Sequence, residues 1–257
     1  DGLKIVNVSD PLNPYKISSF YDGGQVWDVS AKGDLVYLSD NNDGLEIINC
    51  SDINHPKEIG SFNDGGESLG IFINGDLAYI ADYIDGLEII NISDPTDPTK
   101  IGEFFDGGNA YSVQVVGNIA YLCDYSQGFK ILNITDPTNP VKLSEFNNGA
   151  SFKYTFISDK IAFASNDDNG LIILNVSDPS NPWKISGFND GGHTRNIVVA
   201  NNLVYLIDLD TGLEILELTD NPPNQNNYLF IIIITICAIT SISVIIVIYW
   251  LKRKKIF

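Results

Sequence analysis

An eleven-residue segment recurs along the chain at a constant spacing of 42 residues, and this repeat constrains the fold more than any other feature. It begins as DGLKIVNVSDP at residue 1 and DGLEIINCSDI at residue 43, and it returns at residues 85, 127, 169 and 211. No insertion or deletion interrupts the five full units, since five times 42 gives the 210 residues between the first and last copies. A period this strict indicates equivalent units stacked in equivalent environments.

Each unit contains four short apolar runs separated by turn sequences. In one unit the runs surround residues 45–49, 58–62, 68–75 and 77–82. Short runs rich in Ile, Val, Tyr and Phe are typical of strands, and the Asp-Gly, Asp-Pro and Asp-Gly-Gly sequences between them are typical of turns. The repeat therefore predicts an all-β fold, a β-propeller with four antiparallel strands in each blade. A parallel β-solenoid is the alternative fold.

The position of the repeat along the chain predicts an incomplete ring. If the run after Asp-Gly-Gly is the innermost strand, the chain begins with two outer strands, continues through four whole blades and ends with three strands of another. We therefore expect a fragment of a longer protein, in which an upstream segment supplies the missing strands and closes the ring. The first residue, Asp1, is not a translation start, which agrees with a fragment.

The runs LKIVN, LEIIN, FKILN, LIILN and LEILE, which begin the successive units, resemble LVIVD repeats. The resemblance covers residues 1–218, with Asn in place of the final Asp of the repeat and Ile53 in place of a turn proline. It implies a β-propeller on a bacterial or archaeal cell surface. It implies no particular activity, because the family has no single assigned chemistry.

The segment 228–251 contains 24 residues without a charge. At a rise of 1.5 Å per residue, a helix of this length spans about 36 Å, whereas the hydrocarbon core of a bilayer is about 30 Å thick. Four basic residues follow at 252–255. The pattern predicts a single transmembrane helix over 228–251, a cytoplasmic tail over 252–257, a linker over 219–227 and an extracellular propeller in the cell membrane. A buried core helix is the alternative.

The charge and the histidine content exclude several classes of function. The chain has 15 Lys and Arg against 33 Asp and Glu, a net charge of −18, which argues against nucleic acid as a partner. Only His55 and His193 are histidines, and no zinc-hydrolase, nucleophile-elbow or phosphate-loop motif is present. We therefore assign no catalytic residue and expect a protein that is not an enzyme. Cys50 and Cys123 are expected to be buried small hydrophobes.

Two positions just after each Asp-Gly-Gly turn differ from unit to unit, while the turn and core positions agree. In a propeller these positions lie around one mouth of the central channel, where a mixed set of large side chains is typical of a binding site. Filling of the channel is the alternative interpretation. The predicted binding residues are Gln25, Trp27, Glu67, Asn109, Tyr111, Lys153, His193 and Arg195.

Two further sets of residues suggest ligands or modifications. Asp208 and Asp210 place hard oxygen ligands in one hairpin turn, which suits Ca²⁺; otherwise we expect no cofactor. N-x-Ser/Thr sequences recur in the repeat and are potential glycosylation sites outside the cell; their alternative role is turn formation. These sequences begin at Asn7, Asn49, Asn91, Asn133 and Asn175.

The sequence thus predicts a single-pass, cell-surface β-propeller that binds a protein or a glycan. One alternative is an extracellular propeller enzyme, a hydrolase or lyase, with its site at the channel mouth. A purely structural component of the cell envelope is another.

Overall fold

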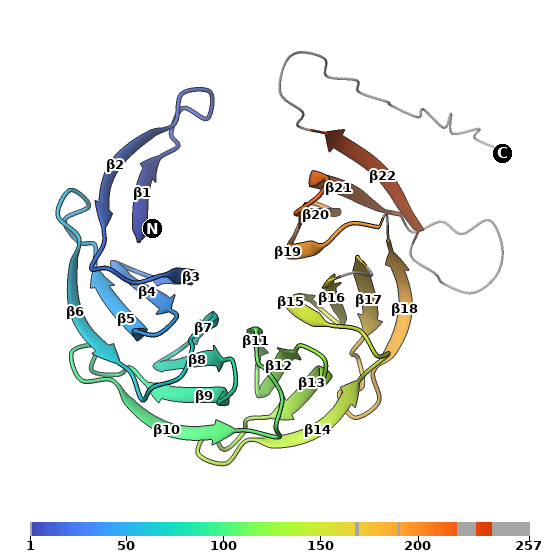
Figure 1. Cartoon of the computed structure of the whole chain (residues 1–257), viewed down its shortest axis with the longest axis horizontal. Coiled ribbons are helices and arrows are strands. Elements are labelled where there is room, and N and C mark those ends of the chain that lie inside the picture. Colours follow the sequence, from blue (N-terminus) through green and yellow to red (C-terminus); the bar gives the residue numbers. More distant parts are fainter. Residues whose placement is uncertain (1, 168–169, 190, 220–229, 238–257) are drawn as a thin grey trace, which may run out of the picture.

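The computed structural model describes residues 2–167, 170–189, 191–219 and 230–237. The regular elements in these ranges are β-strands, which form five four-stranded sheets and one two-stranded sheet. The sheets follow one another along an arc as the blades of a propeller, with their first strands toward its centre (Figure 1). The β-propeller predicted from the 42-residue repeat is confirmed.

Each blade consists of four consecutive strands, hydrogen-bonded in chain order from the centre outward. The two-stranded sheet contains β1 (Leu3–Asn7) and β2 (Tyr15–Phe20). Blade 1 contains β3 (Val26–Lys32), β4 (Leu35–Asp40), β5 (Gly44–Asn49) and β6 (Lys57–Phe62). Blade 2 contains β7 (Gly70–Asn74), β8 (Leu77–Asp82), β9 (Gly86–Asn91) and β10 (Thr99–Phe104). Blade 3 contains β11 (Ser112–Val116), β12 (Ile119–Asp124), β13 (Gly128–Asn133) and β14 (Val141–Phe146). Blade 4 contains β15 (Phe152–Ser158), β16 (Ile161–Asn166), β17 (Leu171–Asn175) and β18 (Trp183–Phe188). Blade 5 contains β19 (Thr194–Ala200), β20 (Leu203–Asp208), β21 (Gly212–Thr219) and β22 (Phe230–Cys237).

The hydrophobic core lies between the blades, which explains the nearly continuous apolar runs of the second and third strands. One cluster combines Leu87 and Ile89 of blade 2 with Val113, Leu122 and Leu132 of blade 3, all at most 4% exposed. A strand covered by a neighbouring blade on each face is apolar at successive positions, as in other sheets buried on both sides.

The hairpin between the second and third strands depends on glycine. Gly44 and Gly86 begin the third strands of blades 1 and 2 with φ of 79° and 85°, a conformation that side chains with a Cβ disfavour. A Cβ at Gly86 would also lie 2.4 Å from the backbone oxygen of Phe104 on the neighbouring strand β10. The turns predicted at the Asp-Gly sequences are confirmed, and their glycines have positive φ.

The outer strand of blade 5 differs from the prediction. We expected an upstream segment to supply this strand, and we expected a helix over 228–251. Instead Phe230–Cys237 forms β22, which pairs antiparallel with β21 from Gly212↔Cys237 to Thr219↔Phe230. The sequence FIIIITIC is rich in Ile, which suits a strand, and β22 covers the otherwise open edge of β21. Among the described residues, no helix is long and apolar enough to cross a membrane.

The rest of the predicted helix, 238–251, lies outside the described residues, as do 228 and 229. The linker is described only at Thr219, and the basic tail over 252–257 is not described.

Candidate functional site

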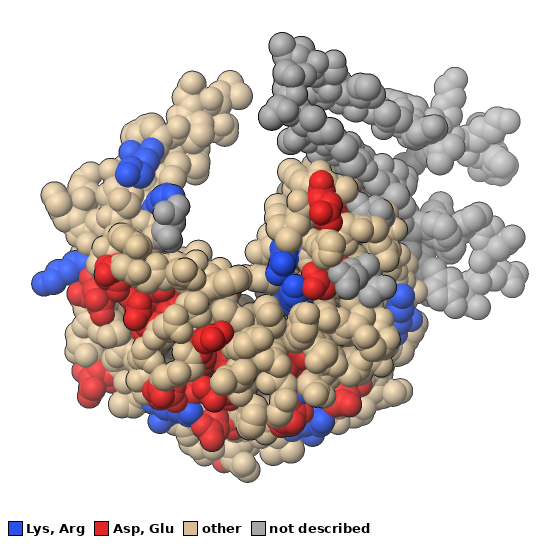
Figure 2. All heavy atoms as spheres, viewed as in Figure 1, with Lys and Arg blue, Asp and Glu red and all other residues tan. Residues whose placement is uncertain are grey.

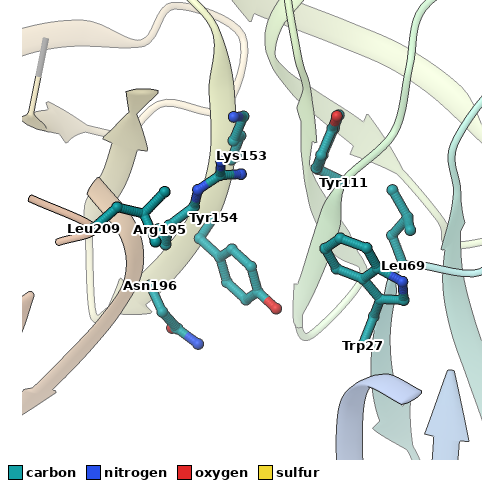
Figure 3. Close-up of a pocket in the computed structure, with 8 residues that line it drawn as sticks. All are labelled: Trp27, Leu69, Tyr111, Lys153, Tyr154, Arg195, Asn196 and Leu209. Atoms are coloured by element: carbon teal, nitrogen blue, oxygen red, sulfur yellow. The ribbon is translucent and has the colours of Figure 1, made fainter. Parts of the chain in front are cut away.

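A cavity of about 390 Å³ lies at the centre of the arc, lined by residues in or next to the first strands of the blades and by Leu209. Figure 2 shows that the viewed face is hollowed at its centre, with Lys and Arg on both sides of the opening and Asp and Glu spread over the blades around it. Figure 3 shows the lining side chains, which come from opposite sides of the cavity. The lining residues are Trp27, Leu69, Tyr111, Lys153, Tyr154, Arg195, Asn196 and Leu209.

The sequence predicts two variable positions of the repeat as binding positions, and the structure brings the five residues at one of them together. All five residues at that position, which are spaced by 42, line the cavity: Trp27, Leu69, Tyr111, Lys153 and Arg195. The other position lies two residues earlier in each unit and does not contribute to the lining. Its predicted members were Gln25, Glu67, Asn109 and His193.

A cage of two aromatic rings and one carboxylate holds Lys153 at the cavity wall. Its Nζ lies 2.6 Å from Asp167 Oδ2, and it lies 5.8 Å from the ring centroid of Tyr111 and 5.5 Å from that of Tyr125. The distances suit an ion pair together with cation–π attraction. Lys153 is 6% exposed, so its ammonium has exchanged water for these partners.

The aromatic rings continue beyond Lys153 as a row. The Tyr111 ring packs edge-on against the Tyr83 ring, with 5.6 Å between the ring centroids, and it lies tilted against the Tyr125 ring, with 5.3 Å between the centroids. Burial raises the pKa of the Tyr111 hydroxyl, as do its neighbours Tyr83 and Tyr125. Burial also raises the pKa of Tyr154, to which Asp28 contributes. These hydroxyls therefore stay neutral at physiological pH and can donate hydrogen bonds.

Trp27 has an exposed ring and Arg195 has a side-chain N–H without a described partner. Trp27 is 51% exposed although it lines the cavity, so its ring is available for stacking. The Nε of Arg195 is buried and has no hydrogen-bond partner among the described residues. A buried donor without a partner costs free energy, which a ligand with an acceptor oxygen would recover.

The family of the chain follows from its repeats. A model of the LVIVD repeat matches residues 23–64, 65–106, 107–148 and 153–190. The chain belongs to the LVIVD-repeat family. The first three matched units contain all the strands of blades 1, 2 and 3, so each LVIVD repeat forms one blade.

Comparison with solved structures supports the same fold. The crystal structure of the computationally designed Ika8 protein superposes with a TM-score of 0.61 at 10% sequence identity, over 79% of this chain and 61% of the designed one. At this identity the similarity shows the fold alone. A search of the curated proteins found no match.

The structure places further residues at the cavity that the comparison of the repeats did not predict. Tyr83, Tyr125, Asp167 and Leu209 occupy one turn position of successive repeats, just after the second strand, and all four lie at or beside the cavity. Their spacing of 42 residues was visible in the sequence, but the position was assigned to turn chemistry.

The hairpin proposed for Ca²⁺ uses its carboxylates otherwise. Asp208 Oδ1 accepts hydrogen bonds from the backbone N–H groups of Asp210 and Thr211, at 2.8 and 3.0 Å. Asp210 Oδ2 lies 2.6 Å from His193 Nδ1. Asp208 Oδ1 therefore serves the turn and Asp210 contacts a histidine, whereas Asp208 Oδ2 is buried without a hydrogen-bond partner among the described residues. Ca²⁺ binding by Asp208 and Asp210 stays a prediction.

The repeated N-x-Ser/Thr sequences form turns. Each asparagine ends a strand, and its side-chain oxygen accepts a hydrogen bond from the backbone N–H two residues later, at 2.8 to 3.0 Å. The asparagine side chains are thus engaged through their oxygen. Cys50 and Cys123 are buried, and burial raises the pKa of the Cys123 thiol to about 12.

Proposed function

We propose that this LVIVD-repeat propeller is an interaction module that binds a protein or glycan ligand at the cavity formed by the first strands of the five blades. The observation that carries the proposal is the convergence of one variable position of every repeat on this cavity. Positions that only maintain the fold agree between the repeats, whereas this position holds Trp, Leu, Tyr, Lys and Arg in turn.

The size and composition of the cavity support binding over channel filling. Its 390 Å³ falls in the range of ligand sites, about 300–1,000 Å³. Side chains that merely fill a channel pack against one another, but Trp27 is half exposed and Arg195 Nε has no described partner. Exposed aromatic rings beside a guanidinium suit a sugar or a peptide carbonyl, because the ring stacks and the guanidinium donates hydrogen bonds.

Replacement of both Trp27 and Arg195 by Ala tests this proposal. Ligands selected on a glycan array and from a peptide-display library with the native protein are the probes. We expect the double variant to lose at least about 2 kcal/mol of binding free energy, because Trp and Arg are the side chains that most often dominate interfaces. We expect its free energy of unfolding to change by less than about 1 kcal/mol, since Trp27 is half exposed.

A matched control is Trp183→Ala with Lys184→Ala on the outer strand β18, where Trp183 is 48% exposed. This variant should bind like the native protein. A Trp27/Arg195 variant that loses several kcal/mol of stability yet keeps its ligand would show that these side chains fill the channel and bind nothing.

We also propose that the segment 228–251 anchors the propeller in the cell membrane, with the propeller outside and the tail 252–257 in the cytoplasm. The 24 uncharged residues and the four bases that follow support this topology. If residues 230–237 stay in β22, only 14 residues remain before position 252 (251 − 237), a helix of about 21 Å. Such a helix is too short for a bilayer core of about 30 Å. A spanning helix and β22 therefore exclude each other.

Protease treatment of intact cells distinguishes a chain anchored by a spanning helix from a chain in which residues 230–237 form β22. For the anchored state we expect external protease to digest the propeller, a tag after Phe257 to stay protected, and the chain to resist extraction with alkaline carbonate. A variant with Asn at all four basic positions, 252–255, is the control and should show mixed orientation, because these charges set the topology. Extraction of the native chain by carbonate, or a protected propeller, would contradict the proposal.

A further inference from the structure

In blades 1, 2 and 3, three equivalent positions meet at one point near the start of the first strand. They are the first residue of the Asp-Gly-Gly turn, the last residue of the second strand and a residue of the third strand. In blade 3 these positions hold Asp106, Asp124 and Lys130. The blades differ in how the charge at this point is balanced.

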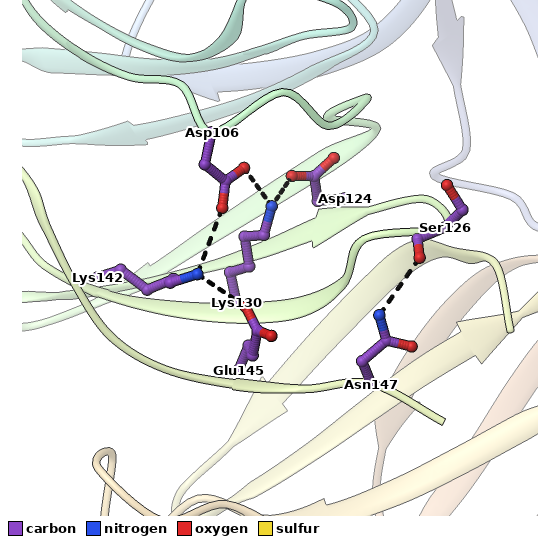
Figure 4. Close-up of polar contacts among 7 residues, drawn as sticks. All are labelled: Asp106, Asp124, Ser126, Lys130, Lys142, Glu145 and Asn147. Carbon is purple, nitrogen blue, oxygen red and sulfur yellow. Dashed lines mark hydrogen bonds and ion pairs between the residues drawn. The ribbon is translucent and has the colours of Figure 1, made fainter. Parts of the chain in front are cut away.

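In blade 3 the chain supplies its own cations. Lys130 is 1% exposed, and its Nζ forms ion pairs with Asp106 and Asp124 (Figure 4). Lys142 Nζ lies 3.5 Å from Asp106 and 2.8 Å from Glu145. The ammonium of Lys130 thus marks a place where this fold accommodates a positive charge between two carboxylates.

In blades 2 and 4 the charge at these three positions is balanced differently. In blade 2 the carboxylates of Asp64, Asp82 and Glu88 have oxygens within 4.8 Å of one another, and Lys100 Nζ lies 3.0 Å from Asp64 and 2.7 Å from Glu88. In blade 4 the three positions are uncharged: Asn148, Asn166 and Ile172. Acids at this point are therefore accompanied by lysine in these two blades or are absent.

Blade 1 departs from this rule. Oxygens of Asp22, Asp40 and Glu46 lie within 4.8 Å of one another, yet the residue equivalent to Lys130 is Glu46 itself and the residue equivalent to Lys100 is Glu58. Glu46 is 3% exposed, and its Oε2 is buried without a hydrogen-bond partner. The structure thus collects negative charge in blade 1 with no ion pair to a lysine or arginine among the described residues.

We propose that Asp22, Asp40 and Glu46 bind a divalent cation of the Ca²⁺ class, which occupies in blade 1 the place that the Lys130 ammonium occupies in blade 3. Three carboxylates supply the hard oxygen ligands that Ca²⁺ prefers, and Asp22 is exposed, so that water can complete the coordination. The buried Glu46 Oε2 gains the partner that it lacks.

Calorimetric titration of the full chain with CaCl₂, after removal of metal by a chelator, tests the proposal. We expect one bound ion per chain at Ca²⁺ concentrations of about 1 mM or below, and a rise in the midpoint of thermal unfolding when Ca²⁺ is added. Asp22→Asn should weaken binding at least about tenfold, and because Asp22 is exposed this variant should fold. Glu46→Lys reproduces blade 3 and should abolish binding while raising the unfolding midpoint of the metal-free protein.

Glu88→Lys makes the same charge change at the equivalent position of blade 2 and is the matched control; it should leave Ca²⁺ binding unchanged. The proposal is overturned if the native chain neither binds Ca²⁺ nor gains thermal stability at about 1 mM, which would mean that a shared proton alone balances the cluster. Unchanged binding in Asp22→Asn and Glu46→Lys would overturn it as well, as would loss of binding in Glu88→Lys.

Discussion

Replacement of Lys130 by Met is expected to lower the free energy of unfolding by about 3–5 kcal/mol, because it leaves buried carboxylates without their counter-ion. Lys130 is 1% exposed and pairs with Asp124, which is 4% exposed, and with Asp106. Met retains most of the length and packing of the lysine side chain, so the loss reports the missing charge. Urea unfolding of the two proteins under identical conditions measures the difference.

Two further variants test whether the loss of stability comes from the buried ion pair. Lys142→Met removes a lysine from the same network whose side chain is 38% exposed, and it should cost less than about 1 kcal/mol. Lys130→Ile combined with Asp106→Asn and Asp124→Asn reproduces the uncharged set of blade 4, and it should recover most of the stability. Equal losses for Lys130→Met and Lys142→Met would show that the buried ion pair has no special energetic role.

The repeat was sufficient to predict the propeller. In a 42-residue unit with no insertions, strand length, turn chemistry and continuous apolar runs all indicate the same four-stranded blade, and the structure places every predicted run of one unit in a strand. The repeat could not predict the structure of Phe230–Cys237, because this segment lies outside the repeat. A run of Ile residues fits a strand and a helix equally well by periodicity, so the sequence alone did not predict β22.

Only part of the candidate site could be predicted from the sequence. Trp27, Tyr111 and Arg195 were found because the repeats disagree at one position and agree around it. The acidic cluster of blade 1 was not found, since Asp22, Asp40 and Glu46 come from a turn and two strands and meet only through the sheet register. Asp208 and Asp210 are close in sequence, so the sequence alone suggested them as ligands; in the structure Asp208 Oδ1 accepts a hydrogen bond from the Asp210 backbone, and Ca²⁺ binding there stays a prediction.

Replacement of Gly86 by Val is expected to lower the free energy of unfolding by about 3–5 kcal/mol, more than the 1–3 kcal/mol typical of backbone strain alone. Two effects combine at this position. The backbone φ of 85° is disfavoured for a β-branched residue, and the added Cβ would lie 2.4 Å from the Phe104 backbone oxygen. A backbone oxygen in a paired strand cannot move aside as a side chain can, so the hairpin must separate from β10.

Gly107→Val isolates the first effect from the second. Gly107 has nearly the same φ, 90°, but a Cβ there has no atom within 4 Å, so strain alone should cost about 1–3 kcal/mol. The difference between the two variants in urea unfolding then measures the overlap with β10. If both variants lose the same stability, the contact between the Gly86 backbone and β10 imposes no steric limit, and Gly86 is required for its φ only.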